Sequence, residues 1–313
     1  MGNVAPDLRS PMALALGSIR LENMLGLMRW GRDGFSSLTR TASPDVMWRR
    51  EEIPAVGEQP AVPVLVYEPR GAEAVTPAVL WIHGGGFIMG TAEQDHKMCL
   101  RVARELGVRV VNVSYRLAPE HPYPAGLNDC FHTLTWMREL GADVGIDPDR
   151  IAVAGESAGG GLAAALAQKA YDHDVPVVFQ LLVYPMIDDR TILRPTAPHR
   201  GSLVWTRNSN AFGWRSYLGR TPHMGDAPQY AAPARRENLA GLAPAWIGVG
   251  DLDLFYDEDV EYARRLQNAG VRCELQVVPG MYHGAEHLNR RSQSMQEFSQ
   301  WKINALRRGL FGT

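Results

Sequence analysis

The sequence is poor in cysteine and in net charge. It has only three cysteines, Cys99, Cys130 and Cys273, and no two of them stand in a C-x-x-C spacing. A sparse, odd set of thiols is not the pattern of a disulfide-stabilised secreted domain, so we expect a reducing, cytoplasmic location. The formal net charge is −2 and no stripe of lysine or arginine is present. This balance argues against nucleic acid as a partner.

Long apolar runs are also missing. The run near the N-terminus, residues 12–19, is short, and Arg20 and Glu22 close it. A membrane-spanning helix needs about 18 or more apolar residues, and a signal peptide needs a small-residue cleavage site, which does not follow. We interpret the run as an amphipathic helix and expect no integral membrane association.

From about residue 62 the sequence alternates short apolar runs with helical patterns. The apolar runs cover residues 62–69, 78–83, 108–115, 151–157, 177–185, 245–251 and 273–279. The helical patterns cover residues 93–107, 125–140, 157–173 and 257–270, with a final helix over 289–310. This alternation predicts an α/β fold with a mostly parallel sheet, of about eight strands, and helices on both faces.

Two segments depart from this pattern. Residues 1–50 have a mixed, mainly helical pattern that glycines interrupt. Residues 188–240 contain many prolines and no clear strand. A long irregular segment inside a compact domain is typically a lid or a binding insertion. Trp205, Phe212 and Trp214 are too apolar for a bare surface loop, so we favour a lid over residues 188–240.

Residues 154–161, AGESAGGG, place one hydroxyl, that of Ser157, between a predicted strand and a predicted helix. Gly155 and Gly159 complete the pattern G-x-S-x-G, and their missing Cβ atoms allow neighbouring backbones to approach. The Ala158 amide would stand at a helix N-terminus, where it can stabilise negative charge. This context predicts a nucleophile elbow rather than a simple helix cap.

A second glycine block, HGGGF at residues 83–87, follows another predicted strand. Its backbone N–H groups can act as donors, and those of Gly85 and Gly86 would form an oxyanion hole together with Ala158. The alternatives are a tight turn or a phosphate loop, but the Lys-Ser/Thr pair of a phosphate loop does not follow.

A serine nucleophile needs a base and an orienting acid. His283 stands just past the last predicted strand, between glycines that indicate a positioned loop. The acid should precede it, and the candidates are Asp251, Asp253 and Asp257. Asp257 looks like the N-cap of the next helix, so we favour Asp253 and keep Asp251 as the alternative. The order Ser, Asp, His is the one expected for α/β-hydrolases.

Together these motifs resemble the hormone-sensitive-lipase-like family of bacterial esterases and lipases, known as bacterial family IV. HGGGF, SYRLAPEHPYPAGLND, GESAGGGLA, GDLDLFYDED and GMYHG occur in the family's order across residues 60–310. The resemblance implies an α/β-hydrolase fold, a serine hydrolase mechanism without metal or cofactor, and a catalytic triad of Ser157, Asp253 and His283.

The resemblance also implies the surroundings of the triad. Its oxyanion donors are Gly85, Gly86 and Ala158, and its supporting residues are His83, Gly84, Tyr115, Arg116 and Glu156. A cap from residues 1–50 and 188–240 would cover a core of 51–187 and 241–313. The substrate pocket would include Phe87, Trp205, Phe212 and Trp214.

The sequence departs from the family pattern at three places. Glu156 stands where Asp or Thr is common, Leu254-Phe255-Tyr256 replaces Pro-Leu-Arg, and Asp259 replaces a glycine. None of these departures removes a catalytic group, but they leave open the shape of the loop that carries the acid.

The reaction implied is hydrolysis of a short-to-medium acyl ester by a serine carboxylesterase. An amide, lactone or carbamate substrate, or a non-catalytic small-molecule receptor, remains as an alternative. His283 to His287 also spell the zinc-peptidase pattern H-x-x-E-H, but Gly284 argues against the helix this pattern needs. The predicted strand 273–278 could be a sheet edge that pairs with a second copy in a homodimer.

Overall fold

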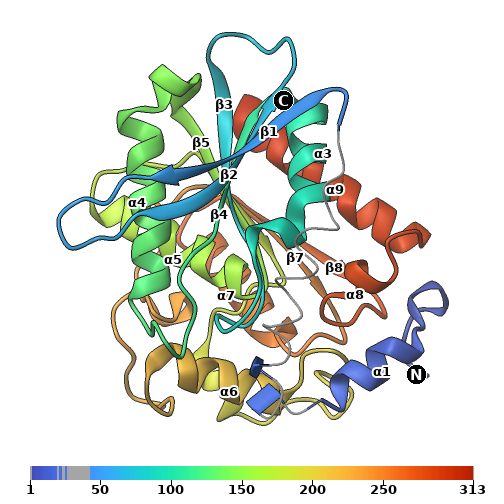
Figure 1. Cartoon of the computed structure of the whole chain (residues 1–313). Helices are drawn as coiled ribbons and strands as arrows, with labels where there is room; N and C mark the ends of the chain where they lie inside the picture. The colour runs from blue at the N-terminus through green and yellow to red at the C-terminus, as the bar shows by residue number, and fades with distance from the viewer. Residues whose placement is uncertain (1, 20, 23–24, 27–42, 313) are drawn as a thin grey trace.

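An eight-stranded sheet forms the centre of the molecule (Figure 1). A computed structural model describes residues 2–19, 21–22, 25–26 and 43–312. The strand order is β1-β2-β4-β3-β5-β6-β7-β8. The strands are β1 (Val46–Ile53), β2 (Val62–Pro69), β3 (Thr76–Ile82), β4 (Arg109–Val113), β5 (Ile146–Glu156), β6 (Phe179–Val183), β7 (Ala245–Gly250) and β8 (Cys273–Val278).

Most of this sheet is parallel, as predicted. Only β2 runs antiparallel to its neighbours, β1 and β4, and the pairs from β4 through β8 are parallel. Every residue of β3, β4, β6 and β7 is buried. Strands covered on both faces need continuous apolar runs, which explains why the sequence shows runs here rather than alternation.

The edge strands differ in how far the sequence predicted them. β8 lies at one edge, as expected. β1 lies at the other edge, and the helical character assigned to residues 46–50 is wrong. Four consecutive charged residues, 49–52, obscure a strand signal here, because an edge strand with only its end residues buried tolerates charge.

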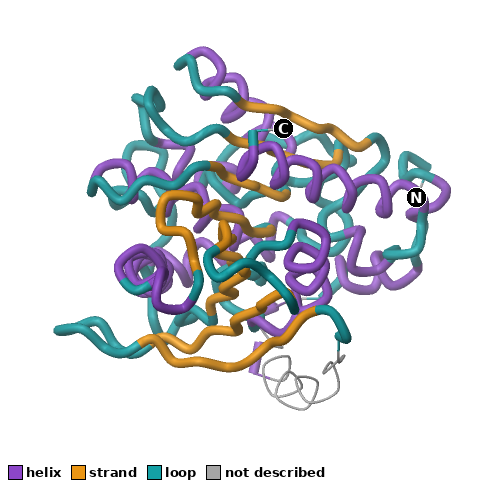
Figure 2. The backbone as a smooth tube through the Cα atoms, turned by 90° about the horizontal axis from the view of Figure 1, so that it is seen from above, coloured by secondary structure: helices purple, strands orange, loops and turns teal. Residues whose placement is uncertain are grey.

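Helices cover both faces of the sheet (Figure 2). One apolar cluster joins the sheet to α4 (Ala125–Glu139), α5 (Ala158–Asp172) and α7 (Tyr256–Asn268). A second cluster joins the opposite face to α3 (His96–Leu106) and α9 (Gln293–Phe311). Two 3-10 helices, η2 (Ala92–Asp95) and η3 (Gly141–Val144), and the short α8 (Ala285–Leu288) complete this core. None of the helices in these described ranges combines the length and apolar character that crossing a bilayer requires.

The segment 188–240, all of which is described, contains no strand, as predicted. It holds η4 (Asp189–Ile192), α6 (Arg207–Leu218) and η5 (Pro233–Arg235). The Thr206 hydroxyl caps α6 by accepting from the Ser209 amide, and Gly219 ends the helix in the left-handed region. Thr206 and Gly219 thus fix where the longest helix of the insertion begins and ends.

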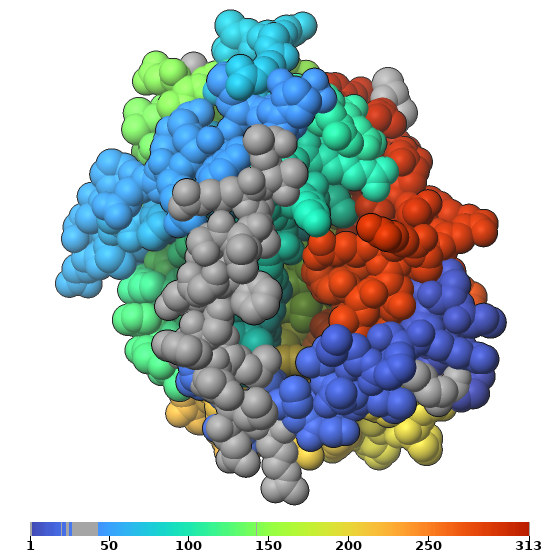
Figure 3. Space-filling model, turned by 45° about the vertical axis from the view of Figure 1, so that its right-hand side comes forward, coloured from blue at the N-terminus to red at the C-terminus, as the bar shows by residue number. Residues whose placement is uncertain are grey.

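The described N-terminal residues lie between this insertion and the C-terminal part of the chain (Figure 3). They form η1 (Pro6–Leu8) and α1 (Pro11–Gly17). The Ala5 amide donates to the Gly280 carbonyl at 3.2 Å, and the Ala13 carbonyl accepts from the Val204 amide at 3.3 Å. Much of the predicted N-terminal cap segment, including residues 27–42, lies outside the described residues.

Candidate active site

Ser157 stands at the turn between β5 and α5, in a strained backbone conformation. Its φ is +57° and its ψ is −120°, a region that residues with a side chain rarely adopt. A Cβ on Gly155 would lie 2.3 Å from the Gly159 carbonyl oxygen, and one on Gly159 would lie 2.1 Å from that of Ile82. These close approaches explain why the sequence needs glycine on both sides of the serine.

The glycine loop after β3 lies directly beside this turn. A Cβ built on Gly84 would lie 3.4 Å from the Ser157 Cβ. Gly85 and Gly86 both have positive φ, +121° and +62°, which favours glycine. Ala158 begins the 15-residue helix α5, so its amide belongs to a helix N-terminus. The glycine loop and the start of α5, which carry the three predicted donor residues, therefore both lie beside the serine.

His283 connects Ser157 to Asp253 through two hydrogen bonds. Its Nε2 lies 2.9 Å from the Ser157 Oγ, and its Nδ1 lies 2.8 Å from the Asp253 Oδ2. Asp253 is fully buried, and its other carboxylate oxygen accepts from the Phe255 amide at 3.0 Å. The loops after β5, β7 and β8 supply the three residues, because parallel strands end at one edge of the sheet.

The two other acid candidates have different surroundings. The Asp251 Oδ1 accepts from the Gly280 amide at 2.7 Å, so this carboxylate holds the loop that precedes His283. The prediction that Asp257 is a helix N-cap is wrong, because α7 begins one residue earlier and its N-cap is Phe255. Asp257 lies in the first turn of α7, where its charge suits the helix dipole and pairs with Arg200 at 2.5 Å.

His83 and Tyr115, two of the residues predicted to brace the glycine loop, contact it, whereas the third, Arg116, binds α4. The His83 ring stacks on the Tyr115 ring at 4.3 Å, and the Tyr115 hydroxyl donates to the His83 carbonyl at 3.1 Å. The His83 Nδ1 lies 2.7 Å from the Gly84 carbonyl oxygen. Arg116 pairs with Asp129 at 2.7 Å and so fastens the loop after β4 to α4.

Among the four aromatic residues predicted for the pocket, Trp205 lies at the triad. Its ring centroid is 6.3 Å from that of His283, and a Cβ on Gly86 would lie 2.1 Å from its Cη2. Phe87 and Trp214 pack on each other at 5.3 Å, and Trp214 is fully buried. Phe212 is half-buried against the same apolar cluster. Trp205 thus limits the space beside the predicted oxyanion donors.

A charged cluster lies behind the serine turn and consists of Glu156, Glu286, His287 and Lys302. The Lys302 Nζ lies 3.1 Å from the Glu156 Oε1 and 2.7 Å from the Glu286 Oε2, and the His287 Nε2 lies 3.3 Å from the Glu156 Oε2. Burial raises the pKa of Glu156, but Lys302 and His287 outweigh burial and hold it below its usual range. The sequence drew attention to Glu156 beside Ser157 and to Glu286 and His287 in the H-x-x-E-H pattern, but no motif indicated Lys302 on α9.

Within the described residues, this cluster also contains three side chains of the types that bind metal ions. Ligand atoms of Glu156, Glu286 and His287 lie within 4.8 Å of one another. The Lys302 ammonium already binds both carboxylates at hydrogen-bonding distance. α8 begins at Ala285, so it does not carry His283, and the H-x-x-E-H pattern does not form the two-histidine helix face of a zinc peptidase.

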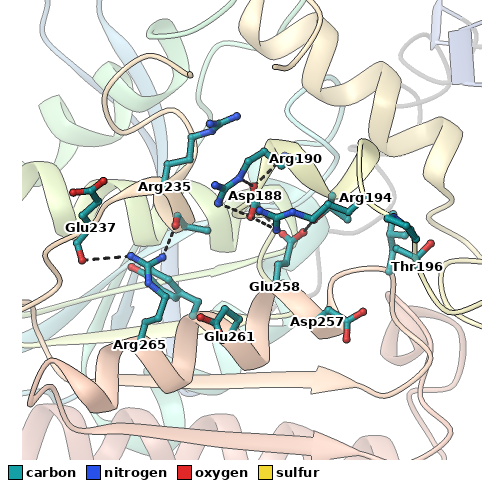
Figure 4. Close-up of a pocket in the computed structure, with 15 residues that line it drawn as sticks. Asp188, Arg190, Arg194, Thr196, Arg235, Glu237, Asp257, Glu258, Glu261 and Arg265 are labelled. Carbon is teal, nitrogen blue, oxygen red and sulfur yellow. Dashed lines mark hydrogen bonds and ion pairs between the residues drawn. The ribbon is translucent and has the colours of Figure 1, made fainter. Parts of the chain in front are cut away.

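A polar pocket of about 400 Å³ lies where residues 188–196 meet α7 (Figure 4). Arg190 and Arg194 both pair with Asp188, at 2.7 and 2.9 Å. Glu258 accepts from the Ile187 amide at 2.8 Å, and burial raises its pKa well above the usual range. Ser157, Asp253 and His283 are not among its lining residues. These contacts fasten the start of the insertion to α7.

Comparisons with known proteins agree with the fold. The family described as alpha/beta hydrolase fold matches residues 79–287. Esterase LipI of Mycobacterium tuberculosis is 41% identical over 213 residues, which cover 68% of this chain and 66% of that protein. Carboxylesterase NlhH of the same species is 40% identical over 227 residues, covering 71% of this chain and 70% of that protein. The chain thus spans about two thirds of the length of these relatives.

The whole chain also resembles a solved structure. Bacterial heroin esterase superposes with a TM-score of 0.90 and 37% sequence identity, covering 99% of this chain and 98% of that one. This similarity confirms the predicted fold, and the names of the relatives support the predicted enzyme class, a serine carboxylesterase.

Proposed function

The chain belongs to the alpha/beta hydrolase fold family, as its resemblance to hormone-sensitive-lipase-like esterases predicted, and from this premise we propose that it hydrolyses carboxylic esters with short-to-medium acyl chains. We assign Ser157 as the nucleophile, His283 as the general base and acid, and Asp253 as the residue that orients His283. The observation that carries the proposal is the pair of hydrogen bonds from His283, at 2.9 and 2.8 Å.

The first half of the reaction forms an acyl-enzyme. His283 Nε2 accepts the Ser157 hydroxyl proton while Oγ forms a bond to the ester carbonyl carbon. The carbonyl oxygen becomes an alkoxide, which the amides of Gly85, Gly86 and Ala158 stabilise. The imidazolium then gives its proton to the leaving alcohol as the bond from carbon to the alkoxy oxygen breaks.

The second half of the reaction releases the acid. A water molecule gives a proton to His283 Nε2 as its oxygen forms a bond to the acyl carbon. The bond from this carbon to the Ser157 Oγ then breaks, the carboxylic acid leaves, and the imidazolium proton restores the Ser157 hydroxyl. The Asp253 carboxylate accepts from the Nδ1–H throughout, so it selects the tautomer with a free Nε2 and stabilises the charged ring. Apart from the ester and the water molecule, each proposed step uses side chains and backbone amides of this chain.

Trp205 supports the preference for short acyl chains. Its indole fills the space beside Gly86, so an acyl group bound with its carbonyl at the proposed oxyanion hole meets an aromatic wall nearby. The Trp205 Nε1 donates to the Asn210 Oδ1 at 3.3 Å, which fixes the ring orientation. Phe87, Phe212 and Trp214 complete the pocket we propose, under a cap that includes residues 188–240.

A ladder of p-nitrophenyl esters from acetate to dodecanoate tests this proposal. We expect the highest kcat/KM at two to six acyl carbons in the wild type and loss of hydrolysis at every length in Ser157→Ala. Hydrolysis that persists in Ser157→Ala, or a preference for acyl chains of ten or more carbons, contradicts it.

Two further expectations, on cellular location and on oligomeric state, accompany the proposal. The sparse cysteines favour a cytoplasmic location, which fractionation of the producing cells tests. The exposed edge of β8 offers backbone groups to a second copy, so we propose a homodimer, and light scattering at micromolar concentration tests it.

A further inference from the structure

One buried ammonium group connects the segments that carry Ser157 and His283. Lys302 comes from α9 and is fully buried. Its Nζ donates to Glu156, the residue before Ser157, at 3.1 Å, and to Glu286, three residues after His283, at 2.7 Å. A single cation therefore bridges the serine turn and the histidine loop, which are far apart in the sequence.

A second contact leads from this bridge to the imidazole itself. The Tyr184 hydroxyl donates to the Glu286 Oε1 at 2.7 Å. The Tyr184 ring meets the His283 ring edge to face, with centroids 4.8 Å apart. Glu286 thus lies between the ammonium of Lys302 and a side chain that packs on the proposed catalytic base.

The histidine loop has little regular structure that could hold it in place. α8 has only four residues, and Gly284 before it adopts a positive φ of +66°. The position of the histidine loop therefore depends on its contacts with other elements. One of these contacts is the buried ion pair between Glu286 and Lys302. A buried pair of this kind is costly to break, because the partner left behind remains charged and away from water.

We propose that Lys302 is a positioning residue for the triad. By binding Glu156 and Glu286 at once, Lys302 holds the Ser157 hydroxyl and the His283 imidazole in the correct relative position. This inference rests on the proposed roles of Ser157 and His283. The other charged or titratable side chains that line the cavity beside Lys302 are Asp95, Lys97, Arg101, His287 and Arg290, and of these His287 binds the Glu156 carboxylate.

Lys302→Met tests the proposal, because it keeps the unbranched side chain up to the ε position and removes the ammonium group with its charge. We expect kcat for p-nitrophenyl acetate to fall about 10- to 100-fold, since a misplacement of about 1 Å can cost 100-fold. KM should stay within threefold, because Lys302 does not approach the pocket we propose for the acyl group. The matched control is Lys169→Met on α5, which removes an ammonium that donates to the Asn128 Oδ1 on α4 at 2.7 Å, and which should keep wild-type kcat.

Lys302→Arg separates positioning from a general loss of structure. A cavity of about 170 Å³ beside Lys302 gives room for the larger guanidinium, which can still bind both carboxylates. We expect the kcat of Lys302→Arg to be at least tenfold higher than that of Lys302→Met. Glu286→Ala should lower kcat similarly, and the double variant with Lys302→Met should lose little more, because both changes break the ion pair between Glu286 and Lys302.

The outcomes are distinguishable. Folded Lys302→Met with kcat within twofold of the wild type, or with a loss that appears only in KM, overturns the inference. If Lys302→Met does not fold, Glu286→Ala decides in the same way, because this side chain borders the cavity and tolerates truncation better. Ser157→Ala is measured alongside: wild-type activity there defeats the proposed function, whereas an inactive Ser157→Ala beside an unimpaired Lys302→Met defeats the positioning role alone.

Discussion

The His283 Nε2 lies 2.9 Å from the Ser157 Oγ, although 126 positions separate the two residues in the sequence. The C-terminal ends of β5 and β8 bring them together, and β7 between these strands supplies Asp253 from the same edge. Proton transfer requires donor and acceptor within hydrogen-bonding reach, and this pair meets that condition without any movement. The arrangement leads to five predictions.

Asp253→Asn should lower kcat by about 10³- to 10⁴-fold, because an amide in place of the carboxylate no longer selects the reactive tautomer of His283. Asp251→Asn removes a charge from the hydrogen bond to Gly280 and should cost about 1 kcal/mol of stability with less than tenfold loss in kcat. Steady-state kinetics and urea unfolding of both variants check this. A larger kcat loss in Asp251→Asn than in Asp253→Asn would transfer the role of the acid to Asp251.

Trp205→Ala should shift the substrate preference toward longer acyl chains. The change removes the indole that lies against Gly86 and opens a space of the size of an aromatic side chain. We expect kcat/KM for the octanoate ester to rise at least tenfold relative to that for the acetate ester. Trp246→Ala, a change of the same size in the core under α9, should leave this ratio unchanged, and an equal ratio in Trp205→Ala and the wild type would exclude Trp205 as the acyl wall.

His287 should stabilise the protein at neutral pH and lose this effect in alkali. Burial lowers its pKa, but the hydrogen bond to Glu156 and the charges of Glu156 and Glu286 outweigh burial and raise it to about 9 from an ordinary 6.5. The protonated form is therefore favoured by folding, so the contribution is complete below pH 6.5 and disappears as the pH rises through 9.

Because 41% of the His287 side chain is exposed, solvent screens the interaction, and we expect about 1 kcal/mol or less. His287→Gln should have a lower Tm than the wild type at pH 6 and an equal Tm at pH 10, as differential scanning calorimetry can measure. A Tm difference that stays constant from pH 6 to pH 10 would show that the charge of His287 plays no part.

Asp259→Asn should stabilise the protein above pH 5. Both Asp259 carboxyl oxygens are buried and, among the residues described, have no hydrogen-bond partner. Burial first, and then the charges of Glu258 and Asp253, raise its pKa well above the ordinary 3.8. The folded state therefore favours the neutral carboxyl, and stability falls as the pH rises above about 4.

The stability gain in Asp259→Asn should accordingly be absent at pH 4 and about 1–3 kcal/mol at pH 8. Asp257→Asn on the same helix is the control, because its side chain is 62% exposed and should show no such gain with pH. Guanidinium unfolding at the two pH values checks both variants. A destabilised Asp259→Asn at pH 8 would mean that a partner satisfies the ionised carboxylate.

The sequence predicted the sheet and the candidate triad because each leaves a local signal. Ser157 follows an apolar run and precedes a helical pattern. Gly155 and Gly159 have no Cβ and so allow the close backbone contacts of this turn. His283 and Asp253 each follow a β-branched run at the end of a strand. Strand ends in a parallel sheet meet at one edge, so these local signals were sufficient to predict that the three residues converge.

The features that the sequence did not predict depend on contacts between distant elements. Lys302 and Glu286 lie on separate helices, and nothing in the spacing of either indicates that Lys302 contacts both Glu286 and Glu156. β1 was missed because Arg49 and Glu51 belong to a charged run at an exposed edge. Contacts of this kind are made between residues that are far apart in the sequence. Local sequence patterns therefore do not predict them.

The most direct test of the central claim is to trap the acyl group on the enzyme. Rapid quenching of the wild type during turnover of p-nitrophenyl acetate, followed by peptide mass spectrometry, should find one acetyl group per chain, on Ser157. The same experiment with Ser157→Ala should find no acetylated peptide and no release of p-nitrophenol above the uncatalysed rate. Acetylation at another residue in the wild type, or undiminished turnover in Ser157→Ala, would contradict the account.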